Sequence, residues 1–136
     1  MKVRIIPHQR NEAAWNLALE EALFLRAKQD LLIGKEIQPV IKTYSFNKPS
    51  VILGYMQNIS EIDYKYCKEN NVDVTMRTTG GGSVYLGKND LQYSLLLNHP
   101  YSKELLKKIN LSLINAFQDS GFSPKLKIKD SHPVIR

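Results

Sequence analysis

The stretch RTTGGGSVYLG, residues 77–87, places three consecutive glycines between an arginine and a run that resembles a β-strand. Glycine has no side chain to pack, and it loses more conformational freedom on folding than any other residue. Strand-like residues lie on both sides of the glycines. The run therefore predicts either a bulged hairpin turn or a loop whose bare main chain contacts a ligand.

Arg77 favours the second of these interpretations. Successive backbone N–H groups in a glycine turn can form a concave anion site, and an arginine at the end of the preceding strand can give two donors to a phosphate. Thr78 and Thr79 add hydroxyl groups. The loop is not a Walker A loop, because no lysine followed by serine or threonine closes it, and no helix follows as in a dinucleotide-binding fingerprint.

Length and composition indicate a single globular domain over residues 1–136, with 43% hydrophobic residues. One cysteine, Cys67, excludes an intrachain disulfide. No segment resembles a signal peptide or the ~20 apolar residues of a membrane span, so we expect a cytoplasmic protein without a membrane partner. The net charge of +6 is spread along the chain without a nucleic-acid-binding pattern, and we expect no nucleic acid as a partner.

Hydrophobic periodicity predicts an α/β (α+β) fold with a mixed, largely antiparallel sheet and flanking helices. Helices are expected over residues 11–28, 59–71 and 102–121. Short strands are expected over residues 1–7, 40–45, 51–55, 72–78, 83–87, 91–98 and 124–129, with no further element after them.

The first helix has an apolar line at helical spacing, which predicts its buried face. That line is Trp15, Ala18, Leu19, Ala22 and Leu25. Asn16 and Glu20 fall on the other side of the predicted helix, and Asn11 is a suitable N-cap.

The segment MRTTGGGSVYLGKNDLQYSLLL resembles the signature of the lipoate–protein ligase A family, within the biotin/lipoate ligase and octanoyltransferase superfamily. NEAAWNLALEEALF is similar to the first helix of that family. NKPSVILGYMQNISEIDYKYCKENNVDV is similar to its next strand and helix. The resemblance covers residues 11–120, and it implies a fold related to class II aminoacyl-tRNA synthetases and biotin ligase.

The resemblance also implies an activity. Family members join lipoate and ATP into lipoyl-adenylate with Mg²⁺, and then transfer the lipoyl group to a lysine of an acceptor. The acceptors are lipoyl domains of the E2 subunits of 2-oxoacid dehydrogenases and the H protein of glycine cleavage. We therefore expect a lipoate–protein ligase with ATP, Mg²⁺ and lipoate as its small-molecule partners.

Matching the motif position by position assigns two groups of residues. The first binds ATP or lipoyl-adenylate, with Arg77 on the nucleotide and Asp90 beside the adenine: Arg77, Gly80, Gly81, Gly82, Ser83, Val84, Tyr85 and Asp90. The second lines the acyl pocket: Tyr44, Phe46, Val51, Leu53 and Gly54. No set of protein metal ligands is expected.

Three departures from the family pattern matter. Met76 replaces the first arginine of a pair, and Leu86-Gly87 replaces a histidine-aspartate pair, which leaves lipoate and octanoate both open as substrates. The family's catalytic lysine belongs to a segment expected beyond Arg136, so no catalytic residue is assigned. We expect an incomplete ligase domain, with a second chain supplying the rest as one explanation.

Two other functions remain open. One is an octanoyl- or lipoyltransferase that takes its acyl group from a carrier thioester and uses no ATP. The other is a non-catalytic module that binds lipoate or its adenylate. Lys125, Lys127 and Lys129 alternate along the last predicted strand and are interpreted as a charged edge. Cys67 is interpreted as a packing residue rather than a nucleophile.

Overall fold

The structure is a computed structural model, and it describes residues 2–100, 102–124, 126–129 and 132–135. The chain divides into two compact units, Met1–Asn98 and His99–Arg136, and each is described by itself. No helix in the described ranges is long and apolar enough to cross a membrane.

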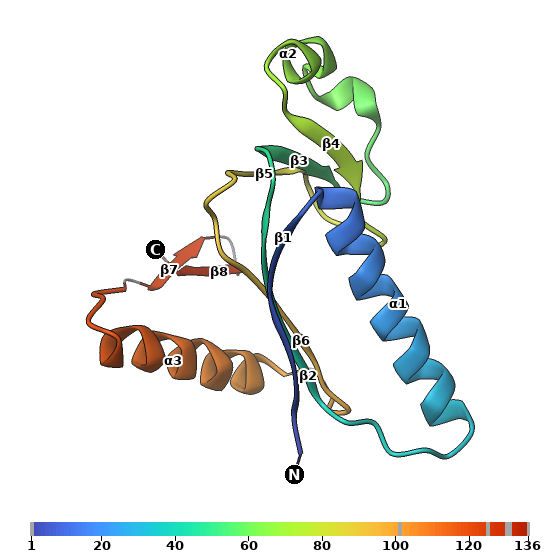
Figure 1. The fold of residues 1–136 in the computed structure, drawn as a ribbon, viewed down its shortest axis with the longest axis vertical. Coiled ribbons are helices and arrows are strands. Elements are labelled where there is room, and N and C mark those ends of the chain that lie inside the picture. The colour runs from blue at the N-terminus through green and yellow to red at the C-terminus, as the bar shows by residue number, and fades with distance from the viewer. Residues whose placement is uncertain (1, 101, 125, 130–131, 136) are drawn as a thin grey trace. The chain divides into compact units, whose positions relative to one another are not determined.

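The first unit contains a long helix, a short one and two small sheets (Figure 1). Its elements are, in chain order, β1 (Arg4–Asn11), α1 (Ala13–Leu32), β2 (Val40–Phe46), β3 (Ser50–Leu53), the 3₁₀ turn η1 (Ile59–Glu61), α2 (Tyr64–Glu69), β4 (Asp73–Met76), β5 (Val84–Leu86) and β6 (Gln92–Leu96).

The two sheets of this unit are both mixed. In one, β2 pairs in parallel with β1 and antiparallel with β6. In the other, β3 pairs in parallel with β4 and antiparallel with β5. The predicted α/β class with a mixed sheet is confirmed. The strands at residues 40–46 and 50–53 do not form one hairpin, because they belong to different sheets.

The second unit contains α3 (Lys103–Asp119) and an antiparallel pair, β7 (Leu126–Lys129) and β8 (His132–Ile135). The Ser102 hydroxyl caps α3 by accepting a hydrogen bond from Leu105 N (3.0 Å), and Gly121 adopts φ +85° after its end. The expectation that no element follows residue 129 was wrong, because β8 pairs with β7. The predicted lysine face, with Lys125, Lys127 and Lys129, lies outside the side chains that the structure describes.

The predicted helix over residues 59–71 is split in two. Asn58 and Glu61 form a capping box around η1, and the Asp63 carboxylate then accepts a hydrogen bond from Tyr66 N (2.9 Å) to start α2. Asn71 follows α2 in the left-handed conformation that ends helices (φ 54°). Cys67 is the buried residue of α2, which fits its interpretation as a packing residue.

The hydrophobic core of the first unit lies where α1 meets the two sheets. It consists of Ala13, Tyr44, Phe46 and Ile52, with Leu17 and Leu86 packed against it. The Tyr44 and Phe46 rings are 5.6 Å apart in a tilted arrangement that suits aromatic pairs.

The predicted inner face of α1 was wrong. Trp15 and Leu25 are 61% and 54% exposed, whereas Asn16 is fully buried. The predicted cap was also wrong: Asn11 is the last residue of β1, paired with Phe46, and Glu12 precedes the helix. α1 thus faces the sheets with a side that carries the polar Asn16 beside the apolar Ala13, Leu17 and Ala27.

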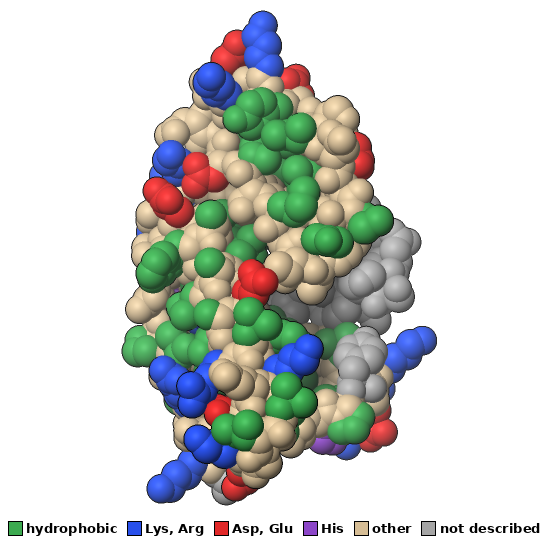
Figure 2. Space-filling view, turned by 90° about the vertical axis from the view of Figure 1, so that its right-hand side faces the viewer, with side chains coloured by type: hydrophobic (Ala, Val, Ile, Leu, Met, Phe, Trp, Pro, Cys, Tyr) green, Lys and Arg blue, Asp and Glu red, His purple; other side chains and the backbone are tan. Residues whose placement is uncertain are grey.

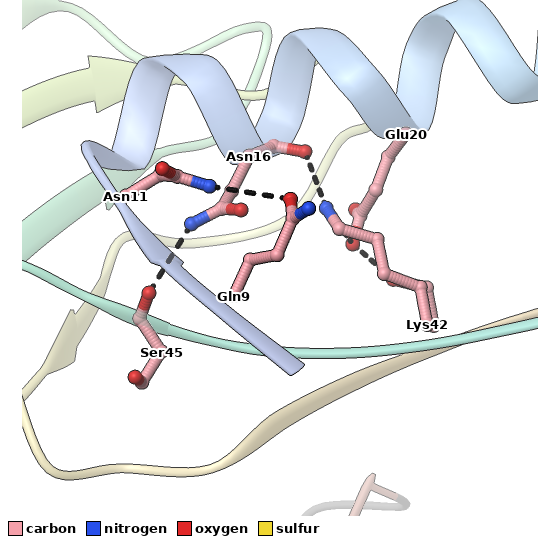
Figure 3. Close-up of polar contacts among 7 residues, drawn as sticks. Gln9, Asn11, Asn16, Glu20, Lys42 and Ser45 are labelled. Atoms are coloured by element: carbon pink, nitrogen blue, oxygen red, sulfur yellow. Dashed lines mark hydrogen bonds and ion pairs between the residues drawn. The ribbon is translucent and has the colours of Figure 1, made fainter. Parts of the chain in front are cut away.

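A buried lysine on β2 explains this orientation (Figure 3). Lys42 is 1% exposed, and its Nζ donates to Asn16 O (2.9 Å), lies 3.8 Å from Glu20 Oε1 and sits 4.0 Å from the Tyr44 ring centroid. The Ser94 hydroxyl donates to the same Glu20 oxygen. A buried ammonium needs polar partners, so the Glu20 carboxylate faces the sheet. The Asn16 contact uses the main-chain carbonyl, and the Asn16 side chain instead donates to Ser45 O (3.3 Å).

Removing this ammonium should destabilise the fold. We expect Lys42→Ala to lower the free energy of unfolding by about 2 kcal/mol, because it leaves Glu20 and a helix carbonyl without their partner. Glu20 is partly exposed, so solvent compensates for some of the loss. The measurement is urea unfolding followed by circular dichroism. The double variant Lys42→Met/Glu20→Gln should recover most of the loss, since it removes both charges.

Lys65→Ala is the matched control, because that lysine side chain is 85% exposed in its helical pair with Glu69. An exposed pair of this kind contributes about 0.5 kcal/mol or less. Equal effects of Lys42→Ala and Lys65→Ala would contradict the role given to the buried lysine.

Candidate functional site

The glycine loop, residues 77–83, crosses the end of β3. Its entry follows β4, whose Met76 pairs with Leu53, and its exit leads into β5, whose Val84 pairs with Ile52 on the other side of β3. Two backbone hydrogen bonds fix the crossing: Arg77 N donates to Leu53 O and Tyr55 N donates to Thr79 O, each at 2.9 Å. The loop therefore lies across the end of the central strand of this sheet and is not a free hairpin tip.

Two glycines in this crossing are required by close main-chain contact. A side-chain carbon built on Gly54 would overlap Gly81 O and approach Gly81 C to 3.0 Å. Gly81 itself has φ +101°, which side chains disfavour, and a carbon there would lie 2.9 Å from Arg77 Nη2. Gly80 and Gly82 instead face open space.

The guanidinium of Arg77 holds the loop from within. Its Nη2 donates to Gly80 O (2.9 Å) and Gly82 O (2.8 Å), and its Nη1 donates to Ile52 O (3.3 Å). These bonds use more than half of the donors of an arginine. The structure thus gives Arg77 a positioning role, and its predicted contact with a nucleotide stays a prediction.

The outer side of the loop offers bare main chain. Gly80, Gly81 and Gly82 are exposed, and their backbone N–H groups donate no hydrogen bond to any residue that the structure describes. Their carbonyls at 80 and 82 are turned toward Arg77. Three unpaired donors held by a charged anchor can bind a carbonyl oxygen or an anion.

The other residues predicted to bind the nucleotide lie outside the three glycines, in two places along the chain. Ser83, the last residue of the loop, is exposed, and so are Val84 and Tyr85 on β5. Asp90 lies in the turn before β6, where its Oδ2 accepts from Gly87 N (2.8 Å) and its N–H donates to Gly87 O (3.1 Å). Its carboxylate holds that turn, and the contact with adenine stays a prediction.

The five residues predicted for the acyl pocket lie in three environments. Tyr44 and Phe46 lie in the core with Ile52. Val51 and Leu53 lie on the opposite face of β3 from Ile52, because successive strand residues alternate. Gly54 faces the glycine loop. The structure does not gather these residues around one cavity, and their joint contact with an acyl chain stays a prediction.

The sequence reasoning missed the polar cluster under α1. Lys42, Glu20 and Ser94 line a cavity of about 120 Å³ together with Leu23, Val40, Leu95 and Leu96. Burial lowers the pKa of Lys42, and the Glu20 carboxylate opposes that shift. Burial also raises the pKa of Tyr44, and Glu20 adds to the effect. A lysine alternating with Val40 and Tyr44 on one strand face was the signal that could have revealed this cluster.

Comparisons with known proteins identify the family whose signature the glycine segment resembles. The family model for the lipoyl protein ligase A/B catalytic domain matches residues 12–132. The chain belongs to this family. Its fold is therefore that of the class II synthetase-like lipoate ligases, as the sequence predicted.

One relative is named for octanoyl transfer, and one similar structure is described as a complex with lipoate. The chain is 34% identical over 110 residues to octanoyltransferase LipM of Clostridioides difficile, covering 80% of this chain and 38% of that protein. It is similar to the structure of Plasmodium falciparum LipL1 in complex with lipoate, with 28% identity, a TM-score of 0.70 and coverage of 93% of this chain and 39% of that one. The chain thus spans less than half the length of either protein.

A third comparison shows the fold alone. It is the structure of a bi-partite lipoate protein ligase and its E2 lipoyl domain from Thermoplasma acidophilum. The identity is 21%, the TM-score is 0.62, and the match covers 96% of this chain and 49% of that one.

The close contact between Gly54 and Gly81 leads to a direct test. We expect Gly54→Ala to lower the free energy of unfolding by about 2 kcal/mol, because the new carbon must push the loop away from β3. Gly80→Ala should change it by about 0.5 kcal/mol or less, since that position faces open space. Urea unfolding of both variants gives the comparison, and equal stabilities would mean that the loop does not rest on Gly54.

Proposed function

We propose that this chain binds an octanoyl or lipoyl group and presents its activated carbonyl for transfer to a lysine of a lipoyl acceptor domain. The observation that carries the proposal is the glycine loop: the N–H groups of Gly80, Gly81 and Gly82 donate to no residue that the structure describes, and the carbonyls of Gly80 and Gly82 are held by Arg77. We expect this activity in the cytoplasm, as the sequence predicts.

The chemistry explains why such a loop is useful. When a lysine amine attacks an acyl thioester, a C–N bond forms, the C–S bond breaks, and the thiol leaves with the proton lost by the amine. Negative charge develops on the carbonyl oxygen before the C–S bond breaks. Fixed N–H donors aimed at that oxygen stabilise the intermediate, and removal of one such donor typically costs about 100-fold or more in rate. No described residue is assigned as nucleophile or base.

We favour transfer from a carrier thioester without ATP, which was the alternative to the predicted ligase. Relatives named octanoyltransferase support this choice. Arg77 supports it too, because its bonds to loop carbonyls leave few donors for a triphosphate. A thioester brings its acyl group already activated, so neither ATP nor Mg²⁺ is needed.

The second candidate is the predicted ATP-dependent lipoate–protein ligase, which would use Mg²⁺ with the nucleotide. Its support is the likeness to a solved structure in complex with lipoate. In either case lipoyl acceptor domains are the proposed partners. A second chain that supplies the family's lysine segment is part of the same proposal.

The two candidates differ in what they consume. We expect the protein to octanoylate an apo-lipoyl domain when given octanoyl thioester of a carrier protein, with no ATP present, as followed by the mass of the acceptor. Acyl transfer from free octanoate or lipoate that strictly requires ATP and releases pyrophosphate would support the ligase instead. If the acyl group binds but is transferred under neither condition, the chain is a binding module, and both proposed activities are wrong.

A further inference from the structure

The helix α1 has a second apolar stripe on its exposed side. The stripe follows a seven-residue repeat at its first and fourth positions, which are the contact positions of a helix that packs against another helix. Its members are Trp15, Ala18, Ala22, Leu25, Gln29 and Leu32. All six are exposed, and Leu32 is 78% exposed. Hydrophobic side chains occur among scattered charges on the side of the molecule shown in Figure 2.

The core of the first unit does not use this stripe. α1 is attached to the sheets through Ala13, Asn16 and Ala27, which lie on its opposite side. Within Met1–Asn98 nothing packs over Trp15 or Leu25. A helix with apolar residues on both sides is typical of one that contacts a further partner.

We propose that the stripe is a self-association surface on which α1 of a second copy packs antiparallel. In that arrangement each large residue meets a smaller or complementary one: Trp15 meets Leu32 of the second copy, and Ala22 meets Leu25. Ala18 meets Gln29 in the remaining layer. A parallel pair would instead stack Trp15 on Trp15 and Ala22 on Ala22, which leaves one layer crowded and another empty.

The charges beside the stripe favour the same arrangement. Glu21 and Lys28 are seven residues apart, so they lie on the same flank of the helix. An antiparallel pair brings Glu21 of each copy beside Lys28 of the other, which gives two attractive pairs. Neither residue makes an ion pair within the part of the chain that the structure describes. Within one helix they are too far apart to pair with each other.

Charge reversal tests the arrangement by sedimentation equilibrium of the full chain. We expect the wild type to dimerise and Leu25→Glu to be monomeric. Glu21→Lys and Lys28→Glu should each weaken self-association about fivefold, because two attractive pairs become repulsive. An equimolar mixture of these two variants should dimerise again, and so should the double variant Glu21→Lys/Lys28→Glu.

Glu36→Lys is the matched control, because it makes the same charge change at an exposed position outside α1, and it should leave the dimer intact. Circular dichroism confirms that each variant is folded. A wild type that stays monomeric at millimolar concentration would overturn the proposal and point to the His99–Arg136 unit or another protein as the occupant. A dimer that survives Leu25→Glu, or a double variant that fails to dimerise, would also overturn it.

Discussion

The contact between the Arg77 guanidinium and the carbonyls of Gly80 and Gly82 determines the shape of the candidate site. A run of three glycines has many accessible conformations, and only a strong anchor can select one of them. Charge-assisted hydrogen bonds from one rigid side chain supply that anchor. The carbonyls turn inward as a result, and the N–H groups at the same positions remain available on the exposed side. In the proposed function, the main-chain N–H groups alone would therefore bind the acyl carbonyl, without further side chains.

A second constraint acts beneath α1. The ammonium of Lys42 is buried on β2, and it requires oxygen atoms from α1 in place of apolar side chains. The side of α1 that faces the sheet therefore differs from the side that hydrophobic periodicity alone predicts. This buried charge acts together with the Asn16 bond to Ser45 O and the packing of Ala13 and Leu17 to set which side of α1 touches the sheet.

Local signals in the sequence predicted much of the fold. The mixed sheet and the helix expected over residues 102–121 are present in the structure, where Ser102 caps that helix and Gly121 follows its end. The orientation of α1 could not be predicted, because it depends on Lys42, which lies 26 residues from Asn16 in the chain. In the site, the need for glycine beside Arg77 was foreseen. The use of the guanidinium by the loop's own carbonyls was not, since it depends on how the loop folds back over β3. Tyr44 and Phe46 lie on β2 and Val51 and Leu53 on β3, and these strands belong to different sheets, which local sequence signals did not predict.

The central claim is that the outer N–H groups of the glycine loop meet the acyl carbonyl. The most direct measurement is the ¹⁵N–¹H spectrum of the labelled protein during titration with an octanoyl thioester. The account predicts that the amide signals of Gly80, Gly81 and Gly82 shift most, and that Arg77→Met, which frees the loop, abolishes those shifts while the core signals of Phe46 and Ile52 persist. Shifts centred on another part of the chain, with these three amides unchanged, would contradict it.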